Sequence, residues 1–81
     1  MVEWTEERME LKTPFIDLLQ LLKATGNAVT GGDAKAAVVQ GKVRVNGVLE
    51  NRKRRKLYVG DCIEFDGRIR IRVVEASKPD K

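Results

Sequence analysis

Residues 41–56 read GKVRVNGVLENRKRRK and carry the strongest structural signals in this chain of 81 residues. Val43 and Val45 alternate with polar residues, so an extended chain would place both valines on one face of a strand. Asn46-Gly47 offers the two residue types that most readily adopt a positive φ, which is the strongest short signal for a hairpin turn. Five consecutive cations follow at 52–56. The stretch therefore predicts a hairpin with a basic segment beside it, and an anionic partner.

Charge is distributed unevenly along the chain. Residues 1–22 carry five acids and two bases, whereas residues 23–72 carry twelve bases and five acids, within a net charge of +4. Because a polyanion can engage many separated cations at once, this balance favours nucleic acid over small acidic molecules as the partner. With 42% hydrophobic and 35% charged residues, the chain is expected to form a single domain, 1–81, with flexible ends at 1–6 and 76–81.

The single cysteine and the absence of histidine narrow the possible chemistry. Cys62 cannot form an internal disulfide, and one Cys without His supplies neither a zinc ligand set nor a Cys-His or Ser-His nucleophile pair. Its place in an alternating run predicts a small buried strand residue. No apolar run reaches the ~18 residues of a membrane span, and the acidic start differs from a signal peptide. We expect no metal, no cofactor and a reducing cytoplasm.

Two helices are expected before the hairpin. Thr13 is a suitable N-cap with Pro14 at the first helical position, and Gly26 ends this first helix. Thr30 begins the second helix, with an acid at the capping-box spacing, and Gly41 ends it. The residues expected to face the core are Phe15, Leu18, Leu19 and Leu22 in the first helix and Ala34, Ala37 and Val38 in the second.

The remaining segments have the alternation of strands. Met9 and Leu11 predict a short first strand after a loose lead-in. Further strands are expected near 42–46, 48–50, 62–65 and 68–74. Asp66-Gly67 is a second hairpin turn. The last strand alternates apolar residues with a row of cations on its other face, namely Arg68, Arg70 and Arg72. The expected fold is α+β, with two short helices packed on a small, mostly antiparallel sheet.

The order of these signals resembles the RNA-binding domain named after the small-subunit ribosomal protein S-four. Two short helices precede a V-x-V-N-G hairpin and a Gly-Asp turn, over roughly residues 13–65. The flanking strands and the basic run look like the small stand-alone bacterial YbcJ-like group of that family. The matching residues are Thr30, Asp33-Ala34-Lys35, Gly41, Val43-Arg44-Val45-Asn46-Gly47 and Gly60-Asp61.

The resemblance implies a helix-turn-helix-like pair on a small sheet, the alpha-L motif, which binds structured RNA through the second helix and neighbouring loops. Many members carry Arg-Leu-Asp where this chain has Phe15-Ile16-Asp17, so an arginine contact is missing. Many also carry arginine where this chain has Lys35, which keeps the charge but loses the planar bidentate fork. We expect RNA affinity or selectivity to differ accordingly.

A cationic face is the candidate binding site. Between Gly41 and Lys56 one acid, Glu50, stands among seven cations, whereas charges that only solubilise a domain would be interspersed with acids. Lys35 is expected to converge with the start of the next strand across Gly41. The residues expected to bind RNA are Lys35, Lys42, Arg44, Arg52, Lys53, Arg54, Arg55 and Lys56, with Lys23, Thr30, Arg68, Arg70 and Arg72 as further candidates.

Three features have a structural as well as a functional interpretation. The backbone amides at Thr30-Gly31-Gly32 could hold a phosphate, or Asp33 could occupy them as a cap.

The carboxylates of Asp61, Glu64 and Asp66 lack other metal ligands nearby, so a nuclease centre is not expected. Trp4 either packs on the domain surface or stacks on a base. With the two phenylalanines, Phe15 and Phe65, expected in the core, no exposed stacking platform is predicted.

The expected function is a non-catalytic module that recognises structured or double-stranded RNA, such as ribosomal RNA, by its shape. We expect a monomer when free, with no small-molecule substrate and no membrane partner. The alternatives are an adaptor that binds an acidic protein and a protein that binds duplex DNA. Ribosome assembly, translation and RNA turnover are all left open.

Overall fold

The structure is a computed structural model and describes residues 3–76. Its elements, in chain order, are β1 Thr5–Leu11, β2 Ile16–Asp17, α1 Leu18–Ala24, α2 Gly31–Val39, β3 Val43–Val45, β4 Val48–Leu49, β5 Lys56–Leu57, β6 Cys62–Phe65 and β7 Ile69–Glu75. A five-stranded sheet has the order β1-β7-β6-β3-β4, and β2 pairs with β5 in a separate two-stranded ribbon. Within the larger sheet, β1 runs parallel to β7 and the other neighbouring strands are antiparallel. The predicted α+β fold with two short helices is confirmed.

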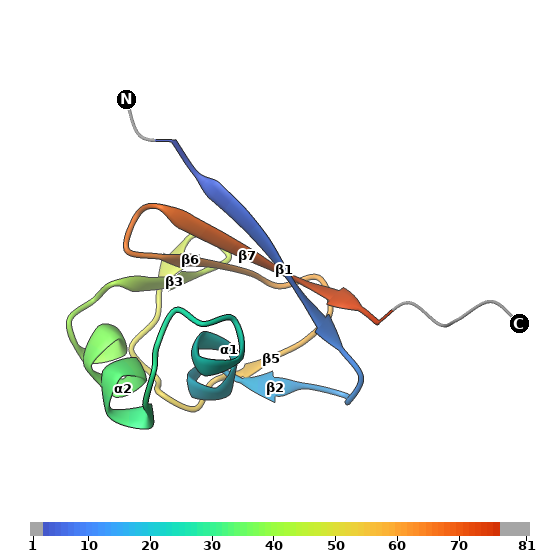
Figure 1. Cartoon of the computed structure of the whole chain (residues 1–81), viewed down its shortest axis with the longest axis horizontal. Helices are drawn as coiled ribbons and strands as arrows, with labels where there is room; N and C mark the ends of the chain where they lie inside the picture. Colours follow the sequence, from blue (N-terminus) through green and yellow to red (C-terminus); the bar gives the residue numbers. More distant parts are fainter. Residues whose placement is uncertain (1–2, 77–81) are drawn as a thin grey trace, which may run out of the picture.

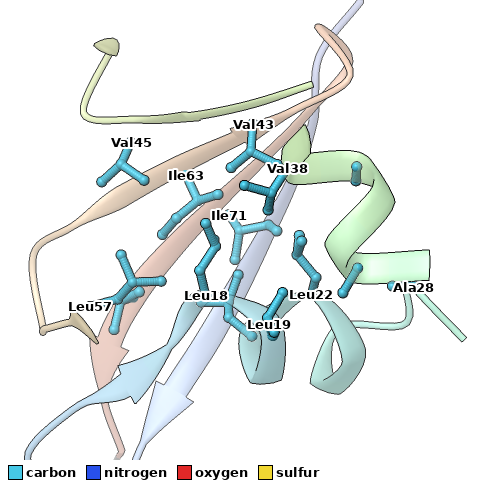
Figure 2. Packing of buried hydrophobic residues seen from close by; sticks show 14 of the residues in the cluster. Leu18, Leu19, Leu22, Ala28, Val38, Val43, Val45, Leu57, Ile63 and Ile71 are labelled. Carbon is cyan, nitrogen blue, oxygen red and sulfur yellow. The ribbon is translucent and has the colours of Figure 1, made fainter. Parts of the chain in front are cut away.

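The hydrophobic core lies between the two helices and one face of the larger sheet (Figure 1). Side chains from both helices and from the three central strands point toward one another in Figure 2: Leu18, Leu22, Val38, Val43, Ile63 and Ile71. Each is at most 1% exposed. Since burying a side chain of this size contributes about 1.5–3 kcal/mol, this cluster is sufficient to hold the helices on the sheet.

The second helix and both hairpin turns form as the sequence predicts. Thr30 is the N-cap of α2, and its Oγ1 accepts a hydrogen bond from the backbone N–H of Asp33 at 3.1 Å. Asn46 adopts a φ of 53° and Asp66 a φ of 57°, each followed by a glycine that also has a positive φ. The Asn46 side chain donates to Asp61 Oδ1 at 3.1 Å and accepts from the Cys62 N–H at 3.0 Å, so this turn is joined to the turn before β6.

The predicted start of the first helix is wrong. Helix α1 begins at Leu18, and its N-cap is Asp17, whose carboxylate accepts a hydrogen bond from the Gln20 N–H at 2.9 Å. The residues expected to form its first turn are extended instead, because Ile16 and Asp17 pair with β5. Phe15 therefore precedes the ribbon and is 40% exposed, whereas we expected it in the core.

Three smaller expectations also require correction. Strand β1 begins at Thr5, inside the predicted loose lead-in, because the Thr5 N–H donates to the Arg68 carbonyl at 2.8 Å and the strand pairs along β7. Cys62 is only half-buried, because the alternation of β6 turns Ile63 toward the core and leaves Cys62 on the other face. Of the predicted tail, Ala76 donates its N–H to the Leu11 carbonyl at 3.2 Å, and the rest lies outside the described residues.

Candidate nucleic-acid interface

The basic segment 52–56 is arranged around a single buried carboxylate. Glu50 is 5% exposed, although it is an acid in a surface loop. Its carboxylate accepts hydrogen bonds from the Arg52 backbone N–H at 2.8 Å, from Arg52 Nε at 3.0 Å and from Arg55 Nη1 at 2.7 Å. The hydrogen bonds from Arg52 and then from Arg55 lower the pKa of Glu50 to about 2, against the opposing effect of burial. Glu50 therefore fixes the conformation of the loop between β4 and β5, residues 50–55, which we call the basic loop.

Arg54 points away from Glu50 and reaches the helices. Its Nη1 lies 3.7 Å from Asp17 Oδ2, yet its side chain remains 77% exposed. Asp17 thus caps α1 with one oxygen and contacts Arg54 with the other. Because Leu18 also donates its N–H to the Arg55 carbonyl at 3.0 Å, the basic loop is attached to the start of α1.

Cations from three elements line one surface hollow beside this contact. Lys23 comes from the last turn of α1, Lys35 from α2 and Arg54 from the loop, and Gly31 lies at the start of α2. Asp17 is the acid in its lining. Arg54 also lines a second hollow together with Arg52, Arg55 and Lys56. We call Lys23, Lys35 and residues 52–56 the helix-loop face.

The start of α2 is capped within the chain. The Thr30 side chain occupies the Asp33 N–H, and the first intrahelical donor is Ala34. The amides of Gly31 and Gly32 precede that donor and so have no intrahelical partner. Thr30, and not Asp33, therefore caps the N-terminus of α2.

Two aromatic side chains lie together beside strand β5, which follows the basic loop. Phe15 precedes β2 and Tyr58 follows β5, and their ring centroids are 6.0 Å apart with a tilt of 53°. Lys56 Nζ lies 4.7 Å from the centre of the Phe15 ring. Tyr58 is 50% exposed. We did not predict this pair from the sequence, although the alternation about the buried Leu57 could have indicated that Tyr58 faces outward.

The outer face of the large sheet carries a different arrangement of charge. The register places Arg44, Glu64, Arg70 and Glu6 on successive strands. Arg70 Nη1 donates to Glu6 at 3.2 Å, and its Nε lies 3.8 Å from Glu64. Its guanidinium also lies 4.6 Å from the centre of the Trp4 ring, so Trp4 packs on this surface. Acids therefore flank the predicted cationic row at Arg70, whereas Arg72 lies opposite Arg8 on one side and Cys62 on the other.

The remaining candidate residues lie around this outer face. Lys42 and Arg44 line a hollow with Trp4, Glu64 and Asp66, whereas Lys35 lines the hollow of the helix-loop face. The three cations that we expected to converge across Gly41 therefore line two different hollows. Arg72 is exposed and pairs across the sheet with Cys62, and Arg68 is exposed in the turn before β7.

The clustered carboxylates have structural contacts of their own. Asp61 accepts hydrogen bonds from the Tyr58 N–H and from Asn46, Glu64 lies beside Arg70, and Asp66 forms the hairpin turn. Among residues 3–76, no group of three His, Cys, Asp or Glu side chains is placed to hold a metal ion. Nor does either helix in that range have the length and apolar character needed to cross a membrane.

Comparison with known proteins identifies the family. Residues 9–74 match the S4 domain. This chain belongs to the S4 domain family. The match includes both helices and five of the seven strands in full, and it covers β1 and β7 in part.

Two curated relatives are similar over most of their lengths. YbcJ of Escherichia coli (strain K12), a candidate RNA-binding protein, is 41% identical over 56 residues, which cover 69% of this chain and 80% of YbcJ. RlbA of Bacillus subtilis (strain 168), a candidate ribosome maturation protein, is 41% identical over 59 residues, which cover 73% of this chain and 83% of RlbA. The expected likeness to the YbcJ-like group is confirmed.

The fold also resembles a solved structure of the same group. The solution structure of E. coli YbcJ, which contains an alpha-L motif involved in RNA binding, matches with a TM-score of 0.63 and 35% sequence identity over 91% of each chain. The two helices on the sheet therefore form the same motif here.

Proposed function

We propose that this chain is a non-catalytic RNA-binding module that docks on structured RNA, such as folded ribosomal RNA, through its helix-loop face. The observation that carries the proposal is the convergence of Lys23, Lys35 and Arg54, from three separate elements, on one hollow. Arginine and lysine side chains brought together in this way can neutralise several backbone phosphates at once. The S4 domain family and the names of its relatives YbcJ and RlbA support RNA as the partner.

Recognition by shape follows from the kind of groups that this face presents. Its exposed polar groups are guanidinium and ammonium ions, which contact phosphates without reading the sequence of bases. Lys42 and Arg44 form a second, weaker contact area, because Glu64 and Asp66 line the same hollow. The folded RNA would therefore approach from the side of the helices and would touch the outer face of the sheet at its margin.

The test is a salt titration with matched variants. A labelled ribosomal RNA hairpin is titrated with the wild-type protein, with the double variant Lys35→Ala/Arg54→Ala, and with the control Lys12→Ala/Arg8→Ala. The control removes the same charge from exposed residues outside the helix-loop face. For two lost phosphate contacts, the slope of log affinity against log salt should fall by about 1.5–2 units in the first variant and stay unchanged in the control.

Two further probes separate the alternatives. A DNA duplex of the same sequence and polyglutamate, as an acidic polypeptide, are titrated under the same conditions. Binding to polyglutamate that is tighter than binding to the RNA would indicate a protein adaptor, and equal affinity for both duplexes would indicate general duplex binding. Equal slopes in the two double variants would show that RNA is bound elsewhere on the molecule.

A further inference from the structure

The Phe15–Tyr58 pair adds a second kind of surface to the helix-loop face. The two residues flank the β2–β5 ribbon at one end, next to the pair formed by Ile16 and Leu57. Continuing this antiparallel register by one residue sets Phe15 opposite Tyr58, as their ring contact at 6.0 Å shows. Leu57 is fully buried, and alternation turns the next residue outward. The fold therefore holds two aromatic rings at the surface.

The aromatic pair is also close to the cations of the helix-loop face. Lys56 is two residues before Tyr58, so their side chains lie on one face, and its Nζ contacts the Phe15 ring at 4.7 Å. Asp17, which pairs with Lys56, contacts Arg54 in the hollow between the helices. The aromatic pair and the cationic hollow are thus two ends of one continuous surface.

Both rings are carried by a fixed backbone. The Tyr58 N–H donates to Asp61 Oδ2 at 2.8 Å, and the carbonyl of Phe15 accepts from Thr13 Oγ1 at 2.8 Å. A ring that is already held in place loses little conformational freedom when a ligand stacks on it. Lys56 covers one face of Phe15, which makes Tyr58 the more accessible ring of the two.

We propose that the Phe15–Tyr58 pair is a stacking site for one unpaired RNA base, and that Lys56 binds the adjoining phosphate. The inference rests on the proposed function and extends it, because it assigns the ligand as a structured RNA with an unpaired nucleotide beside its folded part. Every base presents an apolar π-face, so the site accepts any of the bases. Trp4, which precedes β1, is an exposed aromatic on the outer face of the sheet, where it lies against Arg70.

Two RNA probes test the inference. One is a hairpin with a blunt stem, and the other is the same hairpin with a short unpaired extension that contains a fluorescent adenine analogue. Tyr58→Leu should weaken binding of the extended hairpin at least about fivefold and leave binding of the blunt hairpin unchanged. Wild-type protein should quench the analogue, and Tyr58→Phe, which keeps the ring, should restore both the affinity and the quenching.

The controls keep the result decisive. Trp4→Leu removes an exposed aromatic ring from the second contact area on the other face, and it should leave the ratio of the two hairpin affinities unchanged. Phe15→Leu is a second test of the same site, and urea denaturation of each variant shows whether it is folded. The stacking site would be overturned if wild type bound both hairpins with equal affinity, or if Tyr58→Leu lost the same affinity for both. Salt-dependent RNA binding would still support the proposed function in either case. Failure of wild type to bind either hairpin would overturn both.

Discussion

The helix-loop face and the outer face of the sheet both contain several arginines, but their acids are placed differently. On the sheet, strand register sets Glu64 and Glu6 on either side of Arg70, which is 30% exposed. In the basic loop, the carboxylate of Glu50 is buried, and Arg54 is 77% exposed. The positions of a few acids, more than the number of cations, thus decide which surface can attract a polyanion.

Charge reversal on the two faces should have very different effects on RNA binding. Lys35→Glu/Arg54→Glu on the helix-loop face should weaken binding of a ribosomal RNA hairpin about 100-fold, because two charge-assisted contacts are lost. Arg44→Glu/Arg72→Glu changes the net charge of the protein equally but acts on the sheet, and should weaken binding by less than about fivefold. Fluorescence anisotropy at one fixed salt concentration measures both. Equal losses would mean that the RNA also covers the outer face.

Glu50 and Glu64 should differ in how much each contributes to the stability of the fold. Glu50→Gln removes the charge that holds Arg52 and Arg55, and should lower the free energy of unfolding by about 1–3 kcal/mol. Glu64→Gln removes a surface partner of Arg70 at 3.8 Å and should cost less than about 1 kcal/mol. Urea denaturation of both variants gives the two values. A larger loss for Glu64→Gln would show that the sheet pairs, rather than the buried carboxylate, stabilise the fold.

The pH dependence of stability provides a separate test of the buried carboxylate. The folded-state pKa of Glu50 is about 2, below its ordinary value of 4.5. A lowered pKa means that the unfolded chain binds the proton more readily, so the contribution of Glu50 is complete above about pH 5 and is lost as the pH falls toward 2. Wild type should therefore lose more stability than Glu50→Gln between these pH values. Parallel curves for the two proteins would contradict the assignment.

The parts of the fold that sequence predicted correctly depend on local chemistry. Thr30 before two glycines gave the start of α2, and Asn46-Gly47 and Asp66-Gly67 gave both hairpin turns. Each of these signals acts within a few residues, so a single sequence contains it. The predicted first helix began too early because residues 16–17 form strand β2 instead of a helical turn. Strand β2 pairs with β5, and these two strands have two residues each and lie far apart in the chain. No local pattern reports such a contact.

The candidate site was predicted in its composition but not in its arrangement. The run 52–56 was proposed from its charge, and Lys35 from its charge and the family resemblance; the structure brings Lys35 and Arg54 to one hollow. Glu50 was counted as one acid among cations, because nothing in the sequence showed that it would be buried. Arg70 was placed in a cationic row for the same reason, since its acidic partners come from two other strands.

The smallest expected effect concerns Asp17, the acid in the lining of the cationic hollow. Asn is as good an N-cap as Asp, so Asp17→Asn should keep the hydrogen bond to Gln20 while removing a negative charge 3.7 Å from Arg54. Because Arg54 is 77% exposed and lies 3.7 Å from Asp17, the pair stabilises the protein by less than about 1 kcal/mol, and stability should hardly change.

RNA affinity of Asp17→Asn should rise about twofold at low salt, because Arg54 would no longer share its charge with a carboxylate. The gain should disappear in about 1 M salt, where charges are screened within about 3 Å. Glu10→Gln is the matched control on the sheet, because Glu10 is an exposed acid of β1 outside both contact areas, and it should leave affinity unchanged. A fall in affinity for Asp17→Asn would instead show that Asp17 orients Arg54 toward the RNA. The helix-loop face would then resemble the sheet, where acids position the arginines that they neutralise.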